Sequence, residues 1–158
     1  MVPKRDGGHR LVIDMRPINK YFPRCKVSYE TLSWLSDAPR QTVAAASVDL
    51  SSGYHHLRLH PELQQYMCFQ MEGQYYRSVA LPFGWSLAPA FFTKFMRPVV
   101  AALRAPGLLR LPASWPITQL AGATCSIYLD DLLLLLLRNE CHTDVIAAVL
   151  DLYSRLGL

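Results

Sequence analysis

Three aspartates stand where apolar strand-like sequence gives way to a turn. Asp49 lies near the end of 42–50, a run of small and β-branched residues that predicts a buried strand, and Asp130 and Asp131 directly precede six leucines at 132–137. A carboxylate beside such apolar sequence is costly to bury unless a cation or hydrogen bonds compensate its charge. Paired carboxylates bind Mg²⁺ ions and activate phosphoryl transfer. These aspartates are therefore the first candidates for a catalytic centre.

Spacing alone favours a simpler interpretation of the same aspartates. Asp is common in turns, so Asp130 and Asp131 can form a solvated turn while Asp49 is an unrelated strand end. The three form one centre only if 42–50 and 132–137 are neighbouring strands of one sheet. In that arrangement, Asp49 and Asp130 converge at the same edge.

The elements that would position these residues are strands intermixed with helices. Alternating or β-branched patterns predict strands, including a hairpin across Glu72-Gly73, over 10–16, 42–50, 54–59, 66–71, 74–80, 124–129 and 132–137. Apolar residues at helical spacing predict helices over 28–36, 86–104 and from Thr143 to about Leu156, with Ser28 and Thr143 as caps. The hairpins imply antiparallel pairing, so we expect an α+β fold with helices packed on one face of the sheet.

Composition excludes several classes of protein. Hydrophobic residues make up 51% of the 158 and charged residues 18%, which excludes a disordered tail. The longest apolar stretch is six leucines, whereas a bilayer span needs ~20 residues. Without a secretory signal or a C-x-x-C pair, we expect an intracellular protein of the cytoplasm or nucleus, with no membrane partner. The formal net charge of +4 permits a polyanionic partner.

Four motifs in order resemble those of reverse transcriptases. They are the fingers segment that opens with Val-Pro-Lys-Arg-Asp-Gly-Gly at 2–8, Val-Asp-Leu-Ser-Ser-Gly-Tyr at 48–54, Leu-Pro-Phe-Gly-Trp-Ser-Leu-Ala-Pro at 81–89 and Tyr-Leu-Asp-Asp at 128–131. With phenylalanine at position 83, the third motif resembles the corresponding motif of gypsy-type retrotransposons, plant pararetroviruses and DIRS-type elements. The segment 92–100 favours the DIRS type.

The resemblance implies a polymerase-like fold: a palm-type antiparallel sheet with helices on one face, plus partial fingers. We expect the partial fingers at 1–40 and the palm at 41–158. The palm would include a fingers-associated hairpin at about 60–82 and a loop insertion at about 105–122. We expect the family's thumb and RNase H to be absent from this chain.

The resemblance also gives the aspartates roles. Asp49 and Asp130 would be metal ligands, with the Leu50 carbonyl completing the shell of one of two Mg²⁺ (or Mn²⁺) ions. Asp131 would be a companion carboxylate that contributes negative field more than direct ligation. The metals would promote attack of a primer 3′-hydroxyl on the α-phosphate of the incoming nucleotide.

Five further residues would meet the nucleotide. Lys4 and Arg10 would bind the triphosphate, Tyr54 would lie under the sugar, and Phe83 and Gly84 would lie beside it. Ordinary surface charge is the alternative for Lys4 and Arg10, and core packing is the alternative for Tyr54 and Phe83.

The implied function is that of an RNA-directed DNA polymerase fragment, a nucleotidyltransferase. Its partners would be an RNA or DNA template with primer, deoxynucleoside triphosphates and further domains of a polyprotein. One alternative is a degenerate or repurposed palm that binds nucleic acid without catalysis. Another is an unrelated two-metal enzyme such as a nucleotide cyclase, against which the motifs at 2–8 and 81–84 argue.

Overall fold

The computed structural model describes residues 2–3, 7, 9–105 and 124–158. The chain divides into two compact units, and it passes from one to the other three times. The first unit comprises Met1–Val27 and Ser52–Phe92, and the second comprises Ser28–Ser51 and Thr93–Leu158. Each unit has strands of its own.

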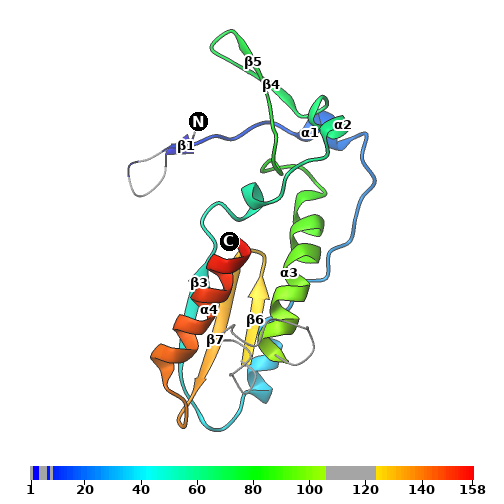
Figure 1. The fold of residues 1–158 in the computed structure, drawn as a ribbon. Helices are drawn as coiled ribbons and strands as arrows, with labels where there is room; N and C mark the ends of the chain where they lie inside the picture. Colours follow the sequence, from blue (N-terminus) through cyan, green and yellow to red (C-terminus); the bar gives the residue numbers. More distant parts are fainter. Residues whose placement is uncertain (1, 4–6, 8, 106–123) are drawn as a thin grey trace. The chain divides into compact units, whose positions relative to one another are not determined.

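The second unit is built on a three-stranded antiparallel sheet. Its strands, in the spatial order β3-β7-β6, are β3 (Thr42–Asp49), β7 (Asp131–Leu137) and β6 (Thr124–Tyr128) (Figure 1). The leucines of β7 dominate its core: Leu132 and Leu134 are fully buried and Leu136 nearly so. Because side chains alternate along a strand, these three share one face of the sheet.

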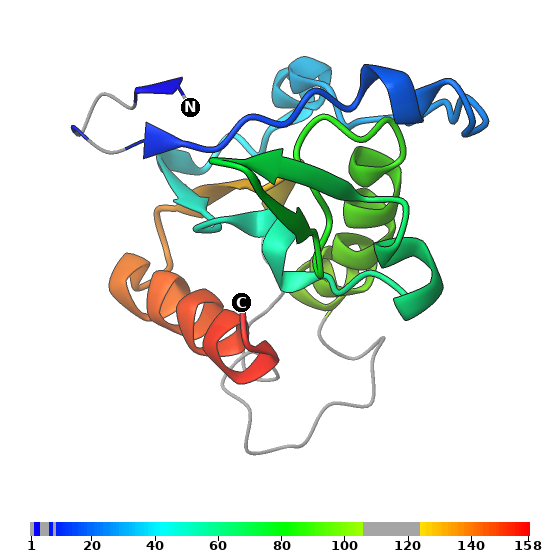
Figure 2. The same cartoon turned by 90° about the horizontal axis from the view of Figure 1, so that it is seen from above.

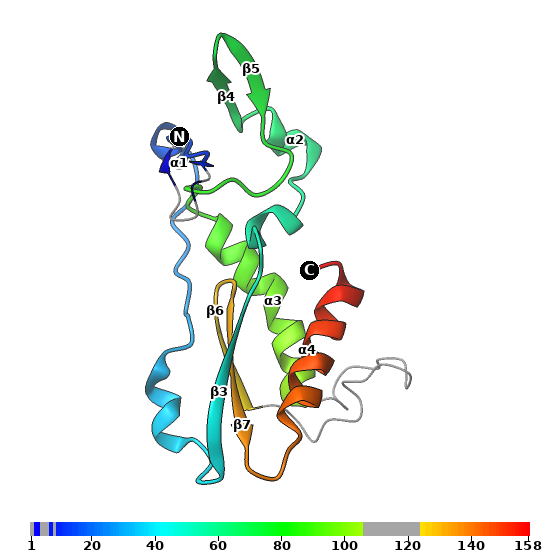
Figure 3. The same ribbon diagram turned by 90° about the vertical axis from the view of Figure 1, so that its left-hand side faces the viewer.

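Two helices cover one face of this sheet. Figure 3 shows α4 (His142–Leu156) and the C-terminal part of α3 (Ala88–Arg104) on the same side, with the 3₁₀ helix η1 (Leu32–Asp37) on the other. In Figure 2, seen from above, α4 and η1 again lie on opposite sides. The buried positions of α4 recur at helical spacing, which explains this packing: Val145, Ala148, Val149, Leu152 and Tyr153.

The first unit consists of short elements. These are β1 (Val2–Pro3) paired with β2 (His9–Arg10), α1 (Arg16–Asn19), η2 (Gly53–His56), α2 (Pro61–Gln64), and β4 (Cys68–Met71) paired with β5 (Gln74–Arg77). The β4–β5 hairpin turns at Glu72-Gly73, where both residues have positive φ, as type I′ turns require. The buried apolar residues of this first unit are Met15, Tyr54, Leu59, Met67, Leu81, Trp85, Ala88 and Phe92.

The predicted mixture of helices and antiparallel strands is confirmed, as are the hairpin, both long helices and the strands on either side of Leu129. Three local predictions are wrong. Residues 54–59 begin with the 3₁₀ helix η2, which follows a left-handed Ser52 (φ +57°). Of the strand predicted at 10–16, only Arg10 lies in a strand (β2); residues 11–15 have no regular secondary structure, and α1 begins at Arg16. The helix predicted over 28–36 forms only at η1.

Two predicted features of the second unit also differ. The strand at 42–50 is predicted to be buried, but most residues of β3 are exposed, and β3 has a strand neighbour on one side only in the described sheet. Cys141, not Thr143, is the N-cap of α4. Apart from Ala105, the predicted loop at 105–122 lies outside the described residues. Within the described part of the chain, no helix combines the length and the apolar character that crossing a bilayer requires.

The core of the second unit gives a direct test of this packing. We expect Leu134→Ala to lower the free energy of unfolding by ~2–5 kcal/mol, because it leaves a cavity under the helices. Leu150→Ala is the matched control: Leu150 is half exposed on α4, so its truncation should cost far less. Urea denaturation of both variants measures the difference. Equal losses would contradict the assignment of Leu134 to the core.

Candidate active site

The ends of β3 and β7 bring two of the predicted aspartates together. Asp49 and Asp131 are direct cross-strand partners in the β3–β7 ladder, and Tyr128 pairs with Asp131 from the other side. Directly opposite residues project from the same face of a sheet, with Cβ atoms ~4.5–5.5 Å apart. Both carboxylates are on exposed residues, whereas Asp130 is half-buried. The partner of Asp49 in the ladder is thus Asp131, one residue beyond the position expected to converge with it.

Asp130 occupies a tight turn and not the strand. The turn between β6 and β7 has two central residues, Leu129 and Asp130, and Asp131 already opens β7. Leu129 has a φ of +56°, in the left-handed region that glycine favours, whereas Asp130 is not among the residues with positive φ. Glycine usually takes this position, so a leucine there carries strain of ~1–3 kcal/mol. Surrounding contacts must therefore hold the turn in place.

One backbone hydrogen bond ties the end of β3 to this turn. The Leu50 N–H donates to the Asp130 carbonyl oxygen at 3.1 Å. Leu50 is 4% exposed, so this bond is shielded from water. It continues the β3–β7 ladder past Asp49 and fixes the main chain on which all three aspartates stand.

The aspartates repel one another. Partial burial raises the pKa of the Asp49 carboxyl above its usual value, and the negative charges of Asp130 and Asp131 raise it further. Ionised Asp49 therefore destabilises the folded chain, and a bound cation would remove that penalty. The site has a deficit of positive charge that a metal ion would fill.

The donor set fits a hard divalent cation. Carboxylate and carbonyl oxygens are the ligands that Mg²⁺ prefers, and Mg²⁺ is commonly held by one or two carboxylates together with substrate phosphates and water. Across the described ranges, no three His, Cys, Asp or Glu side chains surround a common point. The acidic end of the sheet thus offers an open pair of carboxylates and not a closed cage.

The predicted nucleotide-side residues lie in the first unit, where they form an aromatic cluster. The Tyr54 ring is 5.0 Å from that of Phe83 and 5.3 Å from that of Phe92, measured between centroids. His55 adds an edge contact to Phe83 at 5.5 Å. Tyr54 is buried and Phe83 is about one-third exposed. Tyr54 is thus a core aromatic of its unit, and Phe83 is the member of the cluster that reaches the surface.

Asn19 fastens the loop that contains Gly84. The Asn19 side-chain Nδ2 donates to the Gly84 backbone carbonyl oxygen at 2.9 Å, and the Ser86 N–H donates to the Asn19 side-chain oxygen Oδ1 at 2.8 Å. Gly84 has a φ of +88°, so the loop needs glycine for its backbone conformation. A Cβ at Gly84 would meet Met15 at 3.5 Å, an ordinary contact distance. The Asn19 side chain thus bridges two backbone groups of this loop, which is a structural role.

The two predicted triphosphate ligands are placed only in part. Lys4 lies outside the described residues. Arg10 lies in β2, where it pairs with Val2.

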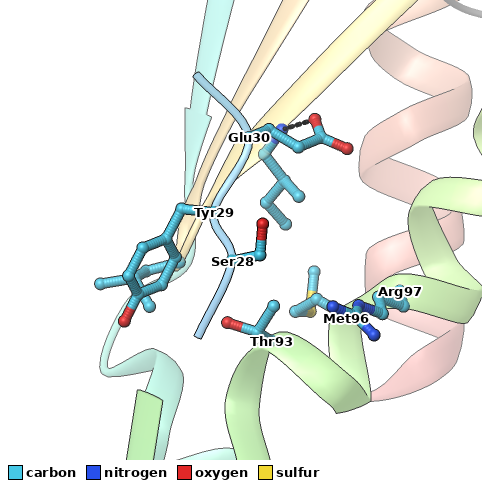
Figure 4. Close-up of a pocket in the computed structure, with 8 residues that line it drawn as sticks. Ser28, Tyr29, Glu30, Thr93, Met96 and Arg97 are labelled. Atoms are coloured by element: carbon cyan, nitrogen blue, oxygen red, sulfur yellow. Dashed lines mark hydrogen bonds between the residues drawn. The ribbon is translucent and has the colours of Figure 1, made fainter. Parts of the chain in front are cut away.

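Sequence reasoning missed a polar cluster beside β6. Glu30 accepts a hydrogen bond from Arg104, and both residues contact backbone atoms of β6. Glu30 also lines a cavity of about 250 Å³, together with Ser28, Tyr29, Thr93, Met96, Arg97, Ile127 and Leu129 (Figure 4). The sequence offers no signal for the Glu30–Arg104 pair, because 74 residues separate its members.

Comparisons with known proteins identify the family of this chain. The model of the family described as reverse transcriptase (RNA-dependent DNA polymerase) matches residues 2–158. The Transposon Tf2-7 polyprotein of Schizosaccharomyces pombe (strain 972 / ATCC 24843) is 26% identical over 103 residues, or 65% of this chain and 8% of that protein. The Tf2-3 polyprotein of the same organism is 27% identical over 99 residues, or 63% and 7%.

Solved structures show the same fold. A foamy viral protease-reverse transcriptase in complex with double-stranded DNA superimposes with a TM-score of 0.67 and 27% identity, covering 98% of this chain and 24% of that one. The native prototype foamy virus protease-reverse transcriptase gives a TM-score of 0.64 at 22% identity, covering 98% and 18%. The chain thus spans under a tenth of the curated relatives and about a fifth to a quarter of these structures. Because the family model matches it almost from end to end, the chain belongs to the reverse transcriptase (RNA-dependent DNA polymerase) family.

Proposed function

We propose that this chain is part of an RNA-directed DNA polymerase that transfers nucleotides from deoxynucleoside triphosphates to a primer 3′-hydroxyl. The observation that carries the proposal is the placement of Asp49 opposite Asp131, next to the turn residue Asp130, in a chain of this family. The substrates would be an RNA or DNA template with primer. The solved relative bound to double-stranded DNA supports a nucleic-acid partner.

The chain's own residues would hold the metal ions that members of this family generally use. Asp49 and Asp130, with the Leu50 carbonyl, would be the ligands, and Asp131 would add negative field beside them. When bound, two Mg²⁺ or Mn²⁺ ions supply Lewis-acid stabilisation of the attacking and leaving oxygens. The strained turn and the Leu50–Asp130 hydrogen bond would orient the carboxylates before any ion arrives.

The nucleotide itself would contact residues of the first unit. Tyr54 would lie beside the sugar, with Phe83 and Gly84 adjoining it, while Lys4 and Arg10 would bind the triphosphate. The rigid packing of Tyr54 against Phe83 and Phe92 supports this role, since a ring that cannot move aside excludes a larger sugar.

We further propose that residues 1–40 belong to the fingers and 41–158 to the palm. The hairpin at about 60–82 would be associated with the fingers. The clustering of Ser52–Phe92 with Met1–Val27 in one compact unit supports that association. Retroelement polyproteins among the relatives support an origin in such an element, of the gypsy, DIRS or pararetrovirus type, acting inside the cell.

The first prediction of this proposal concerns the stability of Asp49→Asn in the absence of metal. We expect Asp49→Asn to stabilise the chain on the order of 0.2–1 kcal/mol at neutral pH with chelator, because it removes a cross-strand like charge. The gain should vanish at low pH: as pH falls through the raised pKa of Asp49, the wild-type carboxyl takes up a proton and the repulsion is lost. Urea denaturation at several pH values measures it. A variant less stable than wild type throughout would refute the repulsion.

The second prediction concerns the same variant with metal. Added Mn²⁺ should stabilise the wild-type chain and should not stabilise Asp49→Asn, since binding to the folded state alone raises stability. Asp151→Asn is the matched control, because Asp151 pairs with Arg155 on α4 and is not part of the acidic site. It should keep the full Mn²⁺ response. Equal Mn²⁺ stabilisation of the wild type and of Asp49→Asn would remove Asp49 from the metal site.

The third prediction tests Tyr54 in a longer chain that carries a thumb. We expect Tyr54→Val to raise the ratio of kcat/KM for ribonucleotides to that for deoxynucleotides by ~5- to 150-fold, the equivalent of ~1–3 kcal/mol of relieved overpacking. Tyr54→Phe keeps the ring and should keep the wild-type ratio. Because the valine also leaves a cavity beside Phe83 and Phe92, absolute rates should fall. An unchanged ratio would make Tyr54 a core residue only.

Extension of a labelled primer on RNA and DNA templates by that longer chain is the direct test of catalysis. Synthesis that requires Asp49, Asp130 and a divalent metal supports the proposal. Template binding without any synthesis would instead indicate a palm that has lost its activity.

A further inference from the structure

One carboxylate oxygen organises the contacts beside β6. Glu30 Oε2 accepts hydrogen bonds from Arg104 Nη2 at 2.6 Å, from Ser126 Oγ at 2.8 Å and from the Ile127 N–H at 3.1 Å. Figure 4 shows the last of these bonds. Burial alone would raise the pKa of Glu30, but these hydrogen bonds outweigh it and lower the pKa below its usual value. The carboxylate is thus held in its charged form by donors that include the main chain of β6.

Arg104 satisfies the neighbouring acceptor on the same strand. Its Nε and Nη2 atoms donate to the Cys125 carbonyl oxygen at 3.2 and 2.8 Å. β6 is an outer strand of the described sheet, so the backbone groups on its free side need partners other than a ladder. Arg104 supplies a donor to the carbonyl of Cys125, and Glu30 supplies an acceptor to the N–H of Ile127, two residues further along that edge.

The contacts continue to the acidic turn. The ring of Tyr29 lies 5.2 Å from that of Tyr128, the residue that precedes Leu129. Tyr29 and Glu30 therefore contact β6 at three consecutive residues, 126–128. The strained Leu129 follows immediately, and a strained turn persists only where surrounding structure determines it.

We propose that Glu30 and Arg104 are positioning residues that clamp the outer edge of β6 and thereby fix the turn that carries Asp130. The clamp itself is independent of the chemistry at the turn. Its consequence for metal binding rests on the proposed function. The two are tested by different measurements.

An exposed ion pair by itself contributes little to stability, so a control pair is needed. Arg155 and Asp151 on α4 form one with side chains 44% and 40% exposed, close to the 42% and 35% of Arg104 and Glu30. The α4 pair links side chains one helical turn apart, whereas Glu30 also binds the main chain of β6. Asp151→Ala is therefore the matched control for Glu30→Ala.

The clamp is tested by hydrogen exchange of the Ile127 amide. We expect Glu30→Ala to accelerate exchange at Ile127 by ~10- to 150-fold, the range for losing one hydrogen bond to a charged group, beyond any change in global unfolding. Glu30→Gln keeps one oxygen acceptor and should show a smaller effect; it also serves if the alanine variant does not fold. Asp151→Ala should leave Ile127 unchanged. Unchanged exchange in folded Glu30→Gln and Glu30→Ala, or an equal acceleration in Asp151→Ala, would overturn the clamp.

The effect on the acidic site is tested by titrating the folded variants with Mn²⁺. Glu30→Ala should weaken Mn²⁺ affinity several-fold, less than the ~10- to 100-fold typical of residues that hydrogen-bond a metal ligand directly. Glu30→Gln should recover part of it. Wild-type affinity in a Glu30→Ala chain whose Ile127 amide is deprotected would overturn the positioning role. If Asp49→Asn binds Mn²⁺ as well as wild type, the proposed function fails, and Ile127 exchange still decides the clamp.

Discussion

Three carboxylates of like charge are held close together at one end of the sheet, and the rest of the unit must offset their repulsion. Antiparallel pairing of β3 with β7 puts the Asp49 and Asp131 carboxylates on one face, and Asp130 stands one residue away in the turn. Without a counter-charge this arrangement costs stability: desolvation by burial raises the pKa of Asp49, and the negative charges of Asp130 and Asp131 raise it further. The leucines of β7 and the helices above them provide the apolar burial that offsets such repulsion. A site of this kind gains stability on binding a cation, which is what a metal-dependent centre requires.

Contacts along the outer edge of β6 also hold the end of the sheet that carries the aspartates. In the described sheet, β6 has a strand neighbour on one side only. On its other edge, Arg104 binds the Cys125 carbonyl and Glu30 binds the Ile127 N–H. This matters because Leu129 sits in a backbone conformation that leucine rarely adopts. A strand free to slip or fray would let the turn relax and separate the carboxylates. The contacts that hold the edge of β6 therefore also hold the turn in place.

The sequence predicts the elements well where a strong periodic pattern exists. The leucine run, the β4–β5 hairpin with its Glu72-Gly73 turn and the amphipathic α4 all form as expected. Short patterns mislead: the alternation at 54–59 spans too few residues to outweigh the left-handed Ser52 that starts η2. The register of strand pairing is harder to predict than the strands themselves, because a shift of one residue moves every side chain to the other face. The sequence predicts that Asp49 and Asp130 converge at one edge of the sheet, but the register that pairs Asp49 with Asp131 is visible only in the structure. The Glu30–Arg104 pair, created only by folding, has no sequence pattern at all.

Paramagnetic broadening of backbone amide signals by substoichiometric Mn²⁺ tests the central claim most directly, since it locates the ion without requiring activity. If the paired aspartates form the metal site, the amides of Asp49 and Leu50 and those from Tyr128 to Leu132 should broaden first. Asp49→Asn should abolish that pattern. Broadening centred on other acidic residues, such as Glu62 or Asp144, or spread evenly over the chain, would contradict the account.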